Sequence, residues 1–242
     1  MQRSLTRKAA SAAMLTSVAL IAAPLNAQTT LTVPGTANIY GAGHATPPAP
    51  GGGGAGTLPP MVTFTAGSFS VLTFSSVTGT VTLNVGSGDN PNDPDGFGAA
   101  PSDSSASAFD GISGISGPLA GWLVGVFETD TEPADPPPAS LDFNTIGTNF
   151  TMLSPTINQV FFIGDGLSGH GSGSVQQFTV PANATHLFLG ISDAPGYHGA
   201  PGAYGDNAGS FVATFNIPEP GVPALLMFAL AAALIQQRRR LR

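Results

Sequence analysis

The chain has 242 residues, and only 9% of them are charged. Its seven basic residues all lie within the first eight and the last five positions, so the acidic segment between them cannot bind nucleic acid by neutralising phosphates. The sequence contains no cysteine, which excludes thiol catalysis, thiolate metal sites and disulfide bonds.

The first 27 residues have the pattern of a secretory signal peptide. Three basic residues precede the apolar run 9–23, and the stretch 24–27 (PLNA) places a small residue at the expected cleavage point. The run is short for a membrane anchor, which needs about 20 apolar residues. We therefore expect residues 1–27 to direct export across the inner membrane, with the mature chain starting near Gln28.

Eight short runs alternate apolar and polar residues with the period of two that is typical of half-buried strands. They cover 61–65, 68–74, 80–85, 122–127, 160–163, 175–180, 185–191 and 211–217. The apolar residues of the last run fall on one face, and Trp122 in the fourth run is expected in the core. The pattern predicts an all-β fold, a single β-sandwich or jelly roll over residues 61–217.

Two segments of biased composition lie outside these runs. Residues 41–60 (GAGHATPPAPGGGGAGTLPP) are of low complexity, cannot pack a core, and belong to an N-terminal segment, 28–60. Residues 129–140 (TDTEPADPPPAS) are acidic and rich in proline, so we expect a solvated loop between strands. Neither segment separates two cores, and the sequence therefore predicts one domain.

An acid-rich loop at 88–96 (GDNPNDPDG) is the first candidate ligand site. Its residues Asp93 and Asp95 carry carboxylates of the kind that hard cations such as calcium bind. Pro91 stands at the first ligand position of an EF-hand pattern and Ser102 at its closing position, which excludes an EF-hand. The alternative is a turn in which Asn and Asp side chains bond to the local backbone.

The second candidate is a longer loop, 193–207, which follows one predicted strand and leads directly into the next. Its acid and amide side chains, which we expect to converge on a calcium ion, are Asp193, Asp206 and Asn207. Its flanking rings are Tyr197, His198 and Tyr204. A calcium ion with open coordination positions can take the vicinal hydroxyls of a sugar, so this loop predicts a carbohydrate site.

The second loop resembles the signature of small calcium-dependent galactophilic lectins of bacteria, the PA-IL type. The matching stretches are Asp193, 201–202, 204–207 and 209–211. The resemblance implies that Asp193, Asp206 and Asn207 are side-chain ligands of calcium and that Ala203 and Leu83 contribute backbone carbonyls. Asp93 and Asp95 lie where the family's sugar-contacting loop is expected, but the His and Gln that grip the sugar there are missing.

The remaining residues that could perform chemistry favour no catalytic function. We interpret His44, His170 and His186 as structural or surface residues and place only His198 near a site. No Gly-x-Ser-x-Gly or His-Glu-x-x-His motif occurs in the sequence. We therefore expect a protein that is not an enzyme, with an extracellular glycan-cleaving enzyme as a further alternative.

The C-terminal tail combines the motif Pro218, Glu219, Pro220 with an apolar run, 221–235, and a basic cluster. The basic residues that close the tail include Arg238, Arg239 and Arg240. The run gives about 22 Å of helix, marginal for a hydrocarbon core of about 30 Å, and the positive-inside rule would keep the arginines in the cytoplasm. An ordinary tail anchor is the alternative.

This tail resembles the PEP-CTERM sorting signal of Gram-negative bacteria, and the resemblance covers residues 218–242. It implies that an exosortase recognises the Pro-Glu-Pro motif and removes the transmembrane helix. The protein would then pass from a transient membrane anchor to the cell surface or the exopolysaccharide matrix.

Together these features predict a secreted, surface- or matrix-sorted protein that binds carbohydrate or exopolysaccharide through a calcium-dependent loop. A purely structural component of a matrix or biofilm, without a specific ligand, is the alternative. Removal of both ends would leave thirteen acids and no basic residue, and calcium would then offset a repulsion that no lysine or arginine can relieve.

Overall fold

The computed structural model describes residues 26–88, 90–98 and 103–218. These residues form many strands and only short helices, which confirms the all-β class. Within them, no helix is both long and apolar enough to cross a membrane. The predicted sorting helix and nearly all of the predicted signal peptide lie outside the described residues.

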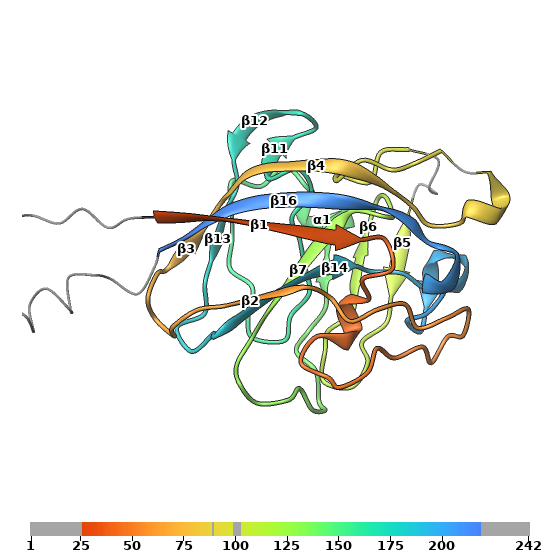
Figure 1. The fold of residues 1–242 in the computed structure, drawn as a ribbon, viewed down its shortest axis with the longest axis horizontal. Helices are drawn as coiled ribbons and strands as arrows, with labels where there is room; N and C mark the ends of the chain where they lie inside the picture. The colour runs from red at the N-terminus through yellow and green to blue at the C-terminus, as the bar shows by residue number, and fades with distance from the viewer. Residues whose placement is uncertain (1–25, 89, 99–102, 219–242) are drawn as a thin grey trace, which may run out of the picture.

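The first sheet consists of three antiparallel strands, in which β16 (Ala208–Pro218) lies between β1 (Asn26–Pro34) and β4 (Phe74–Thr82), as Figure 1 shows. The apolar residues of the alternating run in β16 face inward as predicted, from Phe211 to Ile217. The pairing of β1 with β16 runs over nine residues. β1 therefore pairs with the predicted domain 61–217 from outside its bounds, since it spans the last two residues of the predicted signal peptide and the start of the segment 28–60.

The second sheet has the order β10-β7-β14-β2 and supplies the centre of the molecule (Figure 1). Its strands are β10 (Phe161–Phe162), β7 (Leu123–Glu128), β14 (His186–Ile191) and β2 (Met61–Thr63). All six residues of β7 are buried, because both faces of this sheet are covered. A strand covered on both faces is expected to be apolar nearly throughout, and five of the six residues of β7 fit that expectation. The exception is Glu128 at its end.

Two hydrophobic cores lie on opposite faces of the second sheet. The first fills the space between the two sheets and includes Val33, Phe74, Val81, Leu123, Phe127, Phe161, Leu187, Leu189, Phe211 and Phe215. The second includes Ile39, Tyr40, Ile112, Ile115, Trp122, Val124, Val126, Phe143, Phe162 and Phe188. Trp122 is fully buried, as predicted, and its ring meets that of Phe162 edge to face at 5.2 Å.

Three smaller sheets and a few helical turns complete the fold. One sheet joins β3 (Val71–Leu72), β13 (Gln177–Thr179) and β9 (Met152–Leu153), and β11 (Leu167–Gly169) forms a hairpin with β12 (Ser172–Val175). A further sheet has the order β15 (His198–Gly199), β5 (Ser104–Ala106), β6 (Ile115–Gly117) and β8 (Leu141–Asp142). The helical turns are η1 (Ile39–Gly41), η2 (Val85–Ser87), α1 (Phe143–Ile146), η3 (Pro195–Tyr197) and η4 (Tyr204–Asp206).

The low-complexity segment 41–60 follows a defined path along the molecule. The Asn38 side chain donates hydrogen bonds to the carbonyls of Pro48 (2.7 Å) and Ala55 (3.0 Å). The glycines at 51–54 pair by their backbones with the loop at 201–205. Such pairing needs close approach of two backbones, which glycine permits because it has no Cβ. The segment thus covers the loop 193–207, and from its start Ala42 also joins the second core.

Candidate functional site

The structure brings Asp193 and Asn207, at the two ends of the long loop, into direct contact. The Asn207 Nδ2 donates to Asp193 Oδ2 and to the carbonyl of Gly35, both at 3.0 Å. The backbone N–H of Ala194 donates to Asp193 Oδ1 at 2.8 Å. Both oxygens of this buried carboxylate therefore accept hydrogen bonds, and burial still raises the pKa of Asp193 to about 8.

The other residues predicted for this loop lie in different environments. Asp206 is exposed on η4, whereas Tyr204 is fully buried, and its hydroxyl donates to the carbonyl of Ile191 at 2.8 Å. Ala203 is half-buried and has a positive φ of 67°. Leu83 is buried in the first core, directly after β4. Tyr204 is thus a core residue. In the described part of the chain, no hydrogen bond links Leu83 to Asp193 or Asn207.

One atom of the loop has the character that a hard cation requires. Asn207 Oδ1 is buried and has no hydrogen-bond partner within the described part of the chain. An oxygen in that state is a candidate calcium ligand, because desolvation without a partner is costly. The Asn207 oxygen and the Asp193 carboxylate are both of the kind that calcium binds. The complete site of five residues stays a prediction.

His198, which the sequence placed near this site, lies on β15 and points toward a different partner. Its Nε2 is 3.8 Å from Asp103 Oδ1, and both side chains are more than half exposed. β15 pairs with β5, so this histidine belongs to the surface of the smaller sheet.

The loop at 88–96 provides a second cluster, in which Asp93 and Asp95 meet His170. One potential ligand atom from each of the three side chains lies within 4.8 Å of the other two. The Asp93 and His170 side chains form a hydrogen bond between Oδ2 and Nε2, which raises the pKa of His170. The sequence had assigned His170 to the structural or surface histidines, so the histidine of this cluster was missed.

The local turn that the sequence offered as an alternative is present in this loop. Asp93 Oδ1 accepts from the backbone N–H groups of Asp95 (3.0 Å) and Phe97 (2.9 Å). These bonds hold the Asp93 carboxylate in one orientation, with Oδ2 left to face His170. The turn and the cluster are therefore two parts of one arrangement.

Asp165 ties the hairpin that carries His170 to the rest of the cluster. Its two carboxylate oxygens accept from the backbone N–H groups of Leu167 and Gly171, each at 2.8 Å. Its own backbone N–H donates to Asp95 Oδ1 at 2.9 Å. Asp165 thus positions both His170 and the carboxylate of Asp95.

Asp95 is buried, with 7% of its surface exposed, and lines a pocket of about 230 Å³. Its Oδ2 has no hydrogen-bond partner among the residues that the structure describes. Burial raises the pKa of Asp95 to about 6, and the nearby Asp165 and Asp93 carboxylates contribute in the same direction. One of the residues that line the pocket is therefore an acid with a buried carboxylate oxygen that has no partner among the described residues.

An aromatic ring lies at the mouth of the same pocket. Phe97 is 49% exposed and stacks on His170, with ring centroids 4.3 Å apart. The pocket is completed by Thr148, Asn149, Phe162, Leu167 and Gly169. An exposed ring beside polar side chains is a common composition of ligand sites.

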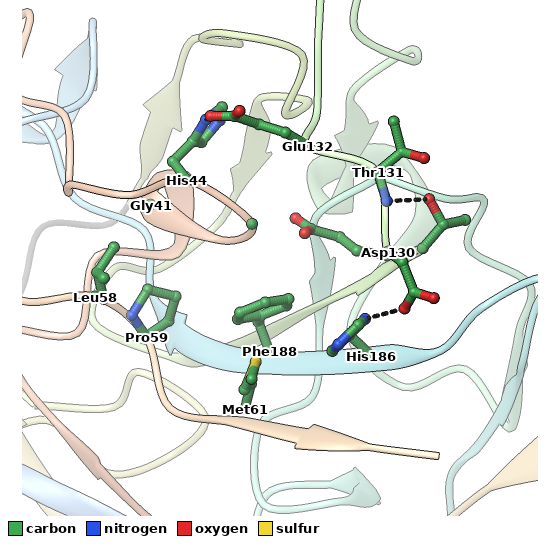
Figure 2. A pocket seen from close by; sticks show the side chains of 13 residues that line it. Gly41, His44, Leu58, Pro59, Met61, Asp130, Thr131, Glu132, His186 and Phe188 are labelled. Carbon is green, nitrogen blue, oxygen red and sulfur yellow. Dashed lines mark hydrogen bonds and ion pairs between the residues drawn. The ribbon is translucent and has the colours of Figure 1, made fainter. Parts of the chain in front are cut away.

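A third place, a pocket of about 450 Å³ between η1 and β14, is shown in Figure 2. Four of its polar side chains form two pairs. His44 Nδ1 bonds with Glu132 Oε1 at 3.1 Å, and His186 lies beside Asp130, with 3.5 Å between Nδ1 and Oδ1. Because these groups already have partners, the pocket offers less to a polar ligand than its size suggests.

Glu128 also lines that pocket, although it is completely buried. Neither of its carboxylate oxygens has a hydrogen-bond partner in the described ranges. The loop around Gly43 covers it so closely that a Cβ at position 43 would lie 2.3 Å from Glu128 Oε2. Burial raises the pKa of Glu128 to about 8, so the side chain is protonated at neutral pH.

No family model, curated protein or solved structure matches this chain. Its function must therefore follow from the chemistry of its own side chains. Among the places described here, the cluster of Asp93, Asp95 and His170 combines a pocket, an unpartnered carboxylate oxygen and an exposed aromatic ring. We regard this cluster and its pocket as the candidate functional site.

The burial of Glu128 predicts a specific dependence of stability on pH. Because its pKa in the folded state, about 8, is above the ordinary 4.5, the folded protein binds more protons between these values. The contribution of Glu128 to the free energy of unfolding is therefore fully present below about pH 4.5 and is lost as the pH rises through about 8. In urea denaturation, the free energy of unfolding of the wild type should fall between pH 4 and 9. In Glu128→Gln this fall should be smaller by on the order of 3–5 kcal/mol.

Glu132→Gln provides the matched control, because this carboxylate lines the same pocket but its side chain is 67% exposed. Its pH dependence should equal that of the wild type. Equal losses in Glu128→Gln and the wild type would contradict the protonated state of Glu128.

Proposed function

We propose that this protein is an exported, surface- or matrix-sorted β-sandwich that binds a carbohydrate polymer such as exopolysaccharide and is not an enzyme. The binding part of the proposal rests on the pocket that the Asp95 side chain and the exposed Phe97 ring line together. A carboxylate oxygen accepts hydrogen bonds from sugar hydroxyls, and an aromatic ring packs on the apolar face of a sugar. Both kinds of contact are needed to hold a hydroxyl-rich ligand.

The charge of the chain indicates which polymers this pocket would accept. Between Lys8 and Arg238 the sequence contains acids but no lysine or arginine. Asp95 lines the pocket and has the carboxylates of Asp93 and Asp165 nearby, and this negative charge repels sulfated or uronic polymers. The proposal is therefore for uncharged saccharides.

Replacing Phe97 should separate ligand binding from folding. Because the Phe97 ring is half-exposed, Phe97→Ala should leave the melting temperature nearly unchanged but weaken binding of the best saccharide at least ten-fold on a glycan array, roughly 1.4 kcal/mol. Met152→Ala, at a side chain of comparable exposure outside the pocket, should bind as the wild type does. An array without any bound saccharide would overturn the proposal in favour of a purely structural matrix protein.

The sorting part of the proposal rests on the two ends of the sequence. Export through residues 1–27 and exosortase cleavage at Pro218, Glu219 and Pro220 would remove every basic residue. Trypsin cleaves after lysine and arginine, so the processed protein has no site for it. The surface fraction should therefore yield an intact chain after unfolding and trypsin treatment, as measured by mass spectrometry.

Glu219→Ala should block processing and leave the arginine cluster attached, so that trypsin shortens the accumulated chain. Recovery of tryptic fragments from the wild-type surface fraction would show that the ends are retained and would contradict this route.

Calcium in the loop 193–207 belongs to the proposal as a structural element that fixes the loop against β1. The exposed Asp206 is the most informative ligand to remove, because its loss should not disturb the buried contact between Asp193 and Asn207. In calorimetry on chelator-treated protein, Asp206→Ala should weaken calcium binding at least ten-fold, whereas Asp103→Ala, an exposed acid elsewhere, should not. Equal calcium affinities in the two variants would remove Asp206 from the site.

A further inference from the structure

The cluster of Asp93, Asp95 and His170 contains the donor atoms of a metal site. Three side chains present ligand atoms within 4.8 Å of one another, so small side-chain movements would let one ion contact all three. They come from two segments, the loop 90–98 and the hairpin of β11 and β12. The fold, rather than a local sequence motif, therefore assembles this set.

The buried oxygen of Asp95 is an independent sign that a ligand belongs here. The side chain is 93% removed from solvent, and its Oδ1 is fixed by the backbone N–H of Asp165. The other oxygen, Oδ2, is buried and has no hydrogen-bond partner in the part of the chain that is described, and Asp95 is one of the three members of the cluster. A buried carboxylate oxygen without a donor is costly, and a bound cation would satisfy it.

The surrounding chain cannot supply that cation. The closest charged groups that influence Asp95 are Asp165, Asp93 and His170. Lysine and arginine are absent from the whole stretch between Lys8 and Arg238. Apart from His170, any positive charge beside Asp95 must therefore come from outside the protein.

The kind of ion follows from the ligand set. Calcium and magnesium prefer oxygen ligands throughout, and calcium takes six to eight of them. Two carboxylates and one imidazole instead suit a first-row transition ion, and zinc commonly combines three such protein ligands with a water molecule. The mixed set at Asp93, Asp95 and His170 thus favours zinc over calcium.

We propose that Asp93, Asp95 and His170 bind a divalent transition-metal ion of the zinc class at the edge of the pocket beside Phe97. Asp165 acts as a positioning residue, because it fixes both the Asp95 carboxylate and the hairpin that carries His170. The positions of the ion that protein ligands do not fill face the pocket and can take hydroxyl groups. This last role rests on the proposed saccharide function, whereas metal binding itself does not.

Calorimetry with zinc, manganese and calcium chlorides tests the site. The full-length chain is purified in a mild detergent without an affinity tag, because a histidine tag would itself bind zinc, and is freed of metal with a chelator. Zinc should bind at one ion per chain, more tightly than calcium does at the same ligands, and should raise the melting temperature. His170→Ala and Asp95→Asn should each weaken zinc binding at least ten-fold.

His198→Ala is the matched control, since this histidine also lies beside an aspartate but outside the cluster. It should bind zinc as the wild type does. Circular dichroism establishes that His170→Ala, whose side chain is more than half exposed, is folded. The absence of saturable zinc binding, or zinc binding that His170→Ala leaves unchanged, would overturn the proposal.

The same samples separate the metal from the saccharide. Zinc binding without any saccharide on the array would leave the metal site supported and remove the carbohydrate function. Saccharide binding that persists after chelation, in a protein that takes no zinc, would do the reverse. Saccharide binding that chelation abolishes and zinc restores would support the two together.

Discussion

Carboxylates inside this protein have no lysine or arginine to pair with, because the sequence holds none between Lys8 and Arg238. Each buried acid must therefore be stabilised by backbone N–H groups, by an amide or histidine, or by a proton. Asp193 uses the first two, since it accepts from Ala194 and from Asn207. Glu128 has no hydrogen-bond partner among the described residues, and burial raises its pKa to about 8, so it keeps its proton at neutral pH. Asp193 accepts the most hydrogen bonds and Glu128 none, with Asp95 between them, but the pKa does not follow this order, because burial also raises that of Asp193 to about 8.

Other acidic side chains fix loops and turns of this fold, which has no disulfide bond. Asp93 closes its turn through two backbone N–H groups, and Asp165 does so for the hairpin of β11 and β12. Asp142 accepts from the N–H of Asn144 at the start of α1. These contacts are stronger than neutral hydrogen bonds because the acceptor is charged. Rigid loops of this kind can present a binding site without a metal or disulfide having to fold them first.

The strands were predictable where alternation is strong and apolar, as in β16 and β14, and less so elsewhere. β1 was missed because it overlaps the end of the predicted signal peptide, although every second residue from Thr29 to Val33 faces inward. The path of residues 41–60 depends on backbone pairing with the loop 201–205, for which the side chains carry no signal. His170 could not be assigned to Asp93 because 77 residues separate them, and only the packing of the hairpin brings them together. The acid-rich loops were found from sequence, but their partners were not.

A metal ion at the cluster would change the electrostatic character of the pocket more than any substitution within it. The Asp95 carboxylate lines the pocket with Asp93 and Asp165 nearby, so without a metal a ligand with hydroxyl groups meets mainly negative charge, beside the amide of Asn149. A divalent ion would add positive charge at this place. A hydroxyl oxygen could then coordinate the ion, while the hydrogen of the same hydroxyl donates to a carboxylate. Binding through both atoms of a hydroxyl group discriminates by geometry as well as by charge. Negative charge would then exclude acidic polymers, the ion would select neighbouring hydroxyls, and Phe97 would contribute the apolar contact that charge alone cannot provide.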